Sequence, residues 1–217
     1  MPQADAGRAV LVLAAGGGTR LGGGKLLLPW KDRPLVAHAV EKALGVPDAS
    51  SVTVVLGHKA DLLQRCLHAT FPAAGFPMLR TVRSLQWERG LSASLQCGIK
   101  AILSAPEALT VESVLVLLAD MPLVREETLS LLCQTHNETM AQKPAHAATV
   151  PTFQGRRGNP AALYRQIFPL LLTLSGDTGA RSLFAALGEN ILYLPVSDPG
   201  ILRDVDTPED YAALPAD

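Results

Sequence analysis

The feature that most constrains this chain is a glycine-rich loop that directly follows a short apolar segment. Residues 10–14 are all apolar, and the next eleven residues contain six glycines together with Arg20 and Lys25. Small residues let backbone N–H groups approach an anion closely, and the two cations supply fixed positive charge. A loop of this composition after a buried strand predicts a binding site for a polyphosphate. The alternative interpretation is a flexible turn with two incidental cations.

The two best-known phosphate-binding motifs do not describe this loop. A Walker A loop requires glycine six residues before its lysine and serine or threonine after it. Thr19 and Leu26 occupy these positions around Lys25. The dinucleotide fingerprint requires a third glycine five residues after the first, and Leu21 stands there when the count begins at Gly16. The loop therefore represents a third pattern.

Apolar segments of strand length alternate with amphipathic segments of helix length. This alternation predicts a Rossmann-like α/β fold, a three-layer αβα sandwich whose mostly parallel sheet is covered on both faces. We expect one domain over residues 8–217, preceded by a short tail at residues 1–7. The expected strands are 10–14, 51–56, 114–118, 147–150 and 191–196, and the expected helices are 34–44, 59–67, 91–103, 125–142 and 180–187.

Composition excludes several classes of protein. The 217 residues are 48% hydrophobic and 18% charged, which is typical of a globular domain, and the net charge is −1. Such a balance argues against general binding of nucleic acid or of a membrane surface. The apolar runs are too short to span a bilayer, and residues 1–8 lack the apolar core of a secretory signal. With three scattered cysteines and no zinc-binding spacing, we expect a cytoplasmic protein with reduced thiols.

Asp120 is the first candidate ligand for a divalent cation. It follows the apolar residues 114–118, and a carboxylate at the end of a buried strand is well placed to hold Mg²⁺, which takes oxygen ligands. The alternative is a turn, or an N-cap for the helix expected from residue 125.

Asp206 is the second candidate. The residues after it predict a helix start, with Thr207 as the N-cap, Pro208 in the first turn and Asp210 as the acid of a capping box. Because Asp206 precedes the cap, its side chain can point toward the sheet edge and complete a cation site with Asp120.

Six motifs follow one another along the chain. They are L-A-A-G-G-G-T-R-L-G-G-G-K at 13–25, R-G-L-S-A-S-L at 89–95, A-D-M-P-L-V at 119–124, R-R-G-N-P at 156–160, G-D-T-G-A-R at 176–181 and D-V-D-T-P-E-D-Y at 204–211. In this order they resemble the MobA-like NTP transferase family, and within it most closely the molybdenum cofactor cytidylyltransferases. The similarity covers about residues 10–214. The family implies a fold of the nucleotide-diphospho-sugar transferase type.

The resemblance also implies a role for individual residues. Lys25, Arg20 and Asp120 would be catalytic, and Asp120 and Asp206 would hold Mg²⁺ or Mn²⁺. The nucleotide would be bound by Ala14, Ala15, Gly16, Gly17, Gly18, Arg20, Lys25, Leu91 and Ser92. The acceptor would be bound by Gly158, Asn159, Pro160, Gly176, Asp177, Gly179 and Arg181.

Departures from the family pattern and plainer interpretations remain. The glycine loop is one residue longer than the commonest form, which leaves its phosphate contacts open, and Ala119 replaces the usual glycine before Asp120. The motif at 89–92 could simply cap a helix through Ser92, and the motif at 176–179 could be an ordinary turn. The arginines of the fourth motif could face solvent, and the two tryptophans could stack on a ligand or pack against the protein.

The resemblance implies transfer of CMP from CTP to molybdenum-bound molybdopterin, with release of pyrophosphate. The acceptor phosphate is already anionic near neutral pH, so the reaction needs charge neutralisation more than a general base. Use of GTP is one alternative, and a sugar-phosphate acceptor is a less favoured one. A further alternative is a non-catalytic accessory protein that delivers cofactor to a molybdenum hydroxylase.

Overall fold

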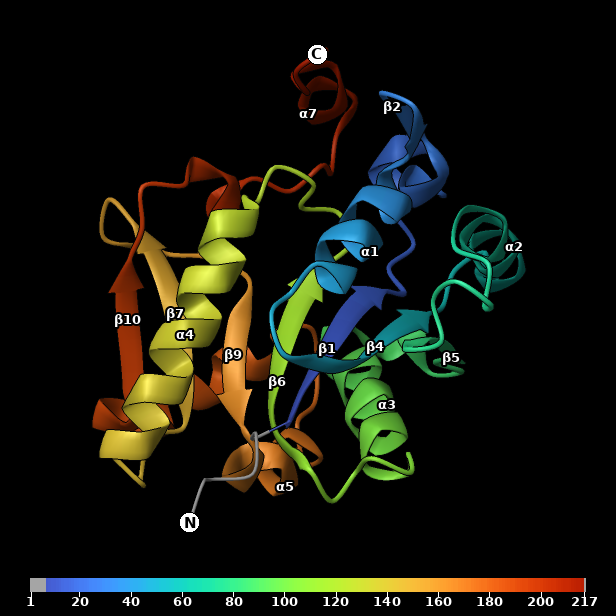
Figure 1. The fold of residues 1–217 in the computed structure, drawn as a ribbon. Helices are drawn as coiled ribbons and strands as arrows, with labels where there is room; N and C mark the ends of the chain where they lie inside the picture. The colour runs from blue at the N-terminus through green and yellow to red at the C-terminus, as the bar shows by residue number, and fades with distance from the viewer. Residues whose placement is uncertain (1–6, 217) are drawn as a thin grey trace.

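The computed structural model describes residues 7–216, and its centre is a twisted mixed sheet (Figure 1). Within these residues the main sheet has eight strands, in the order β10-β7-β9-β6-β1-β4-β5, with β8 paired to β7. The strands are β1 (Gly7–Ala14), β4 (Ala49–Leu56), β5 (Leu79–Arg83), β6 (Val111–Leu118), β7 (Ala148–Phe153), β8 (Arg156–Arg157), β9 (Ala161–Tyr164) and β10 (Ile191–Pro195).

The centre of the sheet is parallel. Strand β1 pairs in parallel with β4 on one side and with β6 on the other, and β4 continues in parallel to β5. Strand β9 runs antiparallel between β6 and β7, while β10 and β7 are parallel to each other. The carboxyl ends of β1 and β6 therefore lie next to each other at one edge, where ligands of open α/β sheets bind.

Helices cover both faces, so the expected three-layer α/β sandwich is confirmed. Side chains of β1 alternate, with Val10 and Val12 in one core and Leu11 and Leu13 in the other. The first core includes residues from α1 (Leu35–Leu44), α2 (Ala60–Thr70) and α4 (Glu126–Gln142). The second includes residues from α3 (Leu91–Leu103), α5 (Phe168–Leu171) and α6 (Phe184–Leu187).

The structure adds elements to the expected set and shortens one. Strands β5 and β9 were not expected: β5 is a half-exposed edge strand, and β9 has only four residues, so neither has a strong apolar pattern. The expected helix at 180–187 is instead a 3₁₀ turn over Gly179–Leu183 followed by the four-residue α6. Of the expected tail, residues 1–6 lie outside the described part, and Gly7 already belongs to β1.

Two small elements complete the site edge. Strands β2 (Pro29–Trp30) and β3 (Arg33–Pro34) form a hairpin, and α7 (Pro208–Ala212) lies beside it at the top of Figure 1. The indole N–H of Trp30 donates to the carbonyl of Pro215 (2.9 Å), and the hydroxyl of Tyr211 donates to the carbonyl of Pro29. Among residues 7–216, the structure contains no helix with the length and apolarity needed to cross a bilayer.

A buried histidine pair joins α4 to β7. His136 is fully buried, its Nδ1 lies 3.0 Å from Oγ1 of Thr149, and Nε2 of His146 lies 3.0 Å from the same oxygen. Burial lowers the pKa of His136 to about 3, with the neighbouring His146 and the buried guanidinium of Arg8 acting in the same direction. His136 is therefore neutral in the folded protein across the physiological range.

This pair predicts a loss of stability in mild acid. Below pH 6.5 the unfolded chain protonates His136 while the folded protein does not, so the free energy of unfolding falls as pH decreases toward 3. The slope from this group approaches about 1.4 kcal/mol per pH unit. We expect His136→Leu to flatten the pH dependence of urea unfolding between pH 7 and 5, whereas His68→Leu, at an exposed position of α2, leaves it unchanged. Equal slopes in both variants would contradict this assignment.

Candidate active site

The loop after β1 is built around the carbonyl of Gly18. The N–H groups of Leu21 and Gly23 both donate to that carbonyl, at 3.0 and 3.1 Å. Gly18 itself has a φ of +56°, and an added Cβ would lie 2.8 Å from Cγ of Lys25. Glycine is required at this position because the lysine side chain passes directly over it. The loop therefore turns tightly and delivers Lys25 to the end of the sheet.

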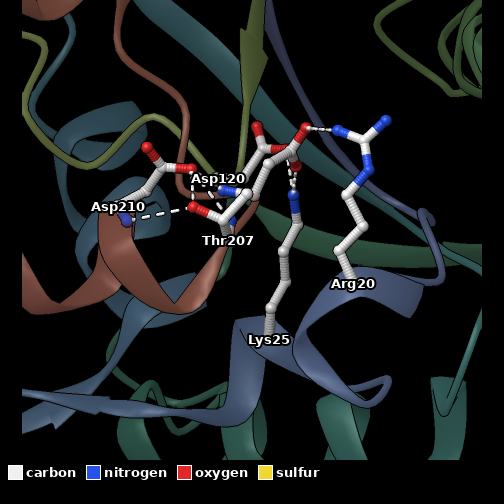
Figure 2. Close-up of polar contacts among 6 residues, drawn as sticks. Arg20, Lys25, Asp120, Thr207 and Asp210 are labelled. Atoms are coloured by element: carbon white, nitrogen blue, oxygen red, sulfur yellow. Dashed lines mark hydrogen bonds and ion pairs between the residues drawn. The ribbon is translucent and has the colours of Figure 1, made fainter.

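Lys25 reaches two carboxylates that are distant in sequence. Its Nζ lies 2.6 Å from Oδ2 of Asp120 and 2.5 Å from Oδ1 of Asp206. The lysine side chain is 6% exposed, whereas the carboxylates are 24% and 38% exposed. Figure 2 shows Lys25 rising from its short helical turn toward Asp120. The ammonium group is thus buried below, and the carboxylates are open to the solvent above.

Each carboxylate has a defined anchor. Asp120 lies just after the end of β6. The preceding residue, Ala119, donates its N–H to the carbonyl of Leu13 in β1 (3.0 Å). Asp206 lies just before α7, where Thr207 and Asp210 form the expected capping box (Figure 2). The capping interpretation of Asp210 is correct, and Asp206 is free to point at Lys25. Asp120 caps no helix in the described residues, since α4 takes Arg125 as its N-cap residue.

Arg20 forms the outer part of the cluster. Its guanidinium Nη1 lies 3.8 Å from Oδ2 of Asp206, and its side chain is 74% exposed (Figure 2). An exposed ion pair at this distance contributes little to stability. Arg20 can therefore turn toward an incoming anion at low cost, in contrast to the buried Lys25.

The lysine remains charged despite its burial. Burial acts to lower the pKa of Lys25, but the charges and hydrogen bonds of Asp120 and Asp206 outweigh it and raise the pKa above its usual value. The ammonium group of Lys25 and the two carboxylates together carry a net negative charge, and the position of the ammonium group is fixed by its two hydrogen bonds. Such a group suits a site where phosphates and a metal ion meet.

The donor set fits a hard divalent cation that is shared with a ligand. The described residues hold no cluster of three or more histidine, cysteine, aspartate or glutamate side chains that could bind a metal alone. Two carboxylates do converge on one point, and Mg²⁺ is commonly held by one or two carboxylates together with substrate phosphates and water. Asp120 and Asp206 therefore provide the protein's share of such a site.

A cavity of about 320 Å³ opens above the lysine. Its lining includes six of the residues that the sequence assigns to nucleotide or metal, namely Gly16, Gly18, Arg20, Lys25, Asp120 and Asp206. Ala14, Ala15 and Gly17 do not line it: Ala14 and Ala15 are buried, and an added Cβ at Gly17 would lie 3.4 Å from the ring of Trp87. Their nucleotide-binding role stays a prediction.

A second cavity, of about 450 Å³, adjoins the first. Leu13 lines both, and the segment from Asp204 to Asp206 contributes one carboxylate to each. The second cavity has a mixed lining, in which apolar residues such as Leu95 and Val116 stand beside the cationic Arg156, Arg157 and Arg181. From the predicted acceptor set, Gly158, Asn159, Asp177, Gly179 and Arg181 line this cavity, as does Leu91.

The remaining predicted acceptor residues lie beside that cavity. Pro160 lines a separate small cavity against α1 and α4, and the Asn159–Pro160 peptide bond is cis. Gly176 accepts the N–H of Ser92 through its carbonyl (3.2 Å) and does not line the second cavity. Both are next in sequence to residues that line the second cavity, and their acceptor-binding role stays a prediction.

The second and fifth motifs form one structural unit. The carboxylate of Asp177 accepts the N–H of Leu91 (2.9 Å) and so caps the start of α3. Ser92 is buried, and its hydroxyl donates to the carbonyl of Ser175 (3.3 Å) rather than capping the helix. One sequence alternative placed the cap at Ser92; the cap comes instead from Asp177, 86 positions after Leu91.

Sequence reasoning gave no role to two acidic residues near the site. Asp204 lines the second cavity, and burial raises its pKa, with the charges of Asp206 and Asp120 adding to the rise. Asp198 is almost completely buried and accepts three hydrogen bonds. Its position before Pro199 and Gly200 is a turn signal that could have marked it.

Comparisons with known proteins identify the family of this chain. A family model described as the MobA-like NTP transferase domain matches residues 10–191. "Nicotine blue oxidoreductase" of Paenarthrobacter nicotinovorans is 32% identical over 94% of both chains. "Purine catabolism protein PucB" of Bacillus subtilis is 29% identical over 92% of this chain and 91% of its own.

Solved structures share the fold. Rv0371c of Mycobacterium tuberculosis superposes with a TM-score of 0.72 and 26% identity over 95% of both chains. The same mycobacterial protein has also been solved in complex with manganese. The family match spans most of the chain and includes the glycine loop, Lys25 and Asp120. This chain belongs to the MobA-like NTP transferase family.

Proposed function

We propose that this protein transfers CMP from CTP to the terminal phosphate of molybdenum-bound molybdopterin. The acceptor phosphate oxygen bonds to the α-phosphorus of CTP while the bond to the β-phosphate oxygen breaks, and pyrophosphate leaves. The observation that carries the proposal is the convergence of Lys25, Asp120 and Asp206 at the sheet edge, next to a second cavity. Family membership supports nucleotidyl transfer as the reaction type.

The chemistry requires two anions to approach each other. Lys25 and Arg20 would neutralise the triphosphate, and Asp120 and Asp206 would hold the divalent cation. When bound, the cation polarises the phosphates and stabilises charge on the leaving pyrophosphate. The buried position of Lys25 adds to its effect, because a fixed charge in a partly desolvated site needs no reorganisation during the reaction.

The second cavity supports an acceptor that has a ring system and anionic groups. Its mixed lining and its three arginines would bind such a molecule, and its contact with the first cavity would place the acceptor phosphate near Lys25. The choice of CTP rests on Ala14 and Ala15, which resemble the cytidylyl members of the family. GTP remains the alternative nucleotide.

The assay of this function measures pyrophosphate release. The protein with Mg²⁺ or Mn²⁺ is given CTP, GTP or ATP, each with and without molybdenum-loaded molybdopterin. We expect release with CTP that depends on the acceptor. Release with GTP instead would assign the guanylyl activity. Release with none of the three nucleotides would contradict the proposal and favour cofactor delivery, or a redox reaction of the kind named for the Paenarthrobacter relative.

Loss of the lysine charge should slow the reaction strongly. We expect Lys25→Met to reduce kcat by on the order of 10²- to 10³-fold, as for other preorganised groups that stabilise developing charge. Lys100→Met, which removes an exposed lysine from α3, is the matched control and should keep wild-type kcat. Near-normal turnover of the Lys25 variant with saturating metal and CTP would rule out this role.

The same substitution should strengthen binding of metal in the absence of nucleotide. The ammonium group of Lys25 occupies the point between the carboxylates, so a free cation competes with it. Removal of a nearby charge of the same sign should improve the binding free energy of Mn²⁺ by more than about 1.4 kcal/mol, which corresponds to a tenfold change in Kd. We therefore expect Lys25→Met to lower the Kd for Mn²⁺ at least about tenfold. A titration followed by the electron paramagnetic resonance signal of free Mn²⁺ measures this Kd. An unchanged or higher Kd would contradict the geometry.

A further inference from the structure

The segment that carries Asp120 is held by two charged side chains, the buried Asp198 and the partly buried Lys42, which take no direct part in the proposed reaction. This segment, residues 120–125, connects β6 to α4 and is named the Asp120 loop here. Asp198, which lies in the C-terminal part of the chain, accepts a hydrogen bond from this loop. Lys42 of α1 donates two hydrogen bonds to it.

Asp198 joins the Asp120 loop to the segment that leads to Asp206. Its Oδ2 accepts the N–H of Arg125 and the hydroxyl of Thr128, each at 2.8 Å. Its Oδ1 accepts the N–H of Gly200 at 2.8 Å. The side chain of Asp198 is 3% exposed, so these bonds form away from water. A single carboxylate therefore satisfies donors of both segments.

Lys42 holds the same loop through its carbonyl groups. Its Nζ donates to the carbonyls of Pro122 (2.5 Å) and Val124 (2.6 Å). Burial lowers the pKa of Lys42, and the charges of Glu126 and Asp198 oppose that shift. The loop thus has a cation on two of its carbonyl groups and an anion on the N–H of its last residue, which fixes its path without any regular secondary structure.

Direct contacts connect the two carboxylate segments as well. The N–H of Val205 donates to the carbonyl of Asp120 (2.9 Å), one residue before Asp206. An added Cβ at Gly200 would lie 2.2 Å from the carbonyl oxygen of Leu123, so the two backbones approach as closely as glycine allows. The backbones that carry Asp120 and Asp206 are therefore held against each other, and Asp198 bonds to both segments.

We propose that Asp198 and Lys42 are positioning residues that set the spacing of Asp120 and Asp206 for the divalent cation. The inference rests on the proposed function of that pair. Residues that hydrogen-bond to a metal ligand typically change metal affinity or activity by about 10- to 100-fold when removed. Asp198 and Lys42 act on Asp120 one step further away, through the backbone of its loop. A purely structural role, capping α4 and a turn, would instead change stability alone.

The test measures metal binding and catalysis in the same variants. Asp198→Asn replaces an acceptor of three bonds by an amide of the same shape, and Lys42→Met keeps the aliphatic stem but removes the donor. We expect each to raise the Kd for Mn²⁺ in the presence of CTP by about tenfold or more and to lower kcat similarly. The KM for CTP should change by less than about threefold.

The matched control lies at the opposite end of β6. Arg165 donates through Nη1 to the carbonyls of Ala108 and Val111, as Lys42 does to Pro122 and Val124, but far from the site. Arg165→Met should lower Tm with Mn²⁺ affinity and kcat within about threefold of wild type. Lys42→Met behaving like Arg165→Met would overturn the inference.

A milder variant covers the case in which Asp198→Asn does not fold. Thr128→Val removes one donor to Asp198 and keeps the N–H of Arg125 in place. We expect a smaller rise in the Kd for Mn²⁺, and an unchanged Kd in the folded variant would overturn the inference.

The failure of the proposed reaction and the failure of the positioning role give different results. Wild-type protein that binds Mn²⁺ and CTP without releasing pyrophosphate would refute the proposed reaction alone, because the Kd for Mn²⁺ can still be compared among the variants. Unaltered Mn²⁺ binding in active variants would refute the positioning role alone.

Discussion

The arrangement of this site depends on one ammonium group held between two carboxylates. Lys25 is 95 residues from Asp120 and 181 residues from Asp206, so the contact connects the beginning, middle and end of the chain. Because the lysine is buried and the carboxylates are partly exposed, its charge is fixed at the base of the cavity. If a metal ion took the place of the ammonium group between the carboxylates, the same charge would be positioned to reach a phosphate.

Several elements exist to bring these three groups together. The tight glycine loop carries Lys25 over Gly18, and the parallel pairing of β1 with β6 places Asp120 opposite the end of that loop. Asp206 is held from outside the sheet, because the helix that follows it, α7, contacts the β2–β3 hairpin. Tyr211 of α7 donates to the carbonyl of Pro29, and Trp30 donates to the carbonyl of Pro215, which follows α7. The hairpin follows the glycine loop directly, so the last segment of the domain is tied to the first.

The sequence predicted the parts of the site whose signals are local. Glycines, Lys25 and the capping box of Thr207 and Asp210 have strong short-range patterns, and the alternation of strands and helices gave the α/β class. Contacts between distant segments carry no such pattern. The antiparallel β9, the cap that Asp177 provides to α3, and the contacts of Asp198 and Lys42 each depend on a partner that only folding brings near. Ser92 shows the same limit, because its hydroxyl is directed to Ser175 and not to its own helix.

A crystal structure with Mn²⁺ and a non-hydrolysable CTP analogue tests the central claim most directly. The account predicts a Mn²⁺ ion, identified by its anomalous peak, that is bound by oxygens of Asp120, Asp206 and the triphosphate. The ammonium group of Lys25 should have moved from the carboxylates to a phosphate oxygen. A nucleotide bound elsewhere, with Lys25 still paired to both carboxylates and no metal between them, would contradict it.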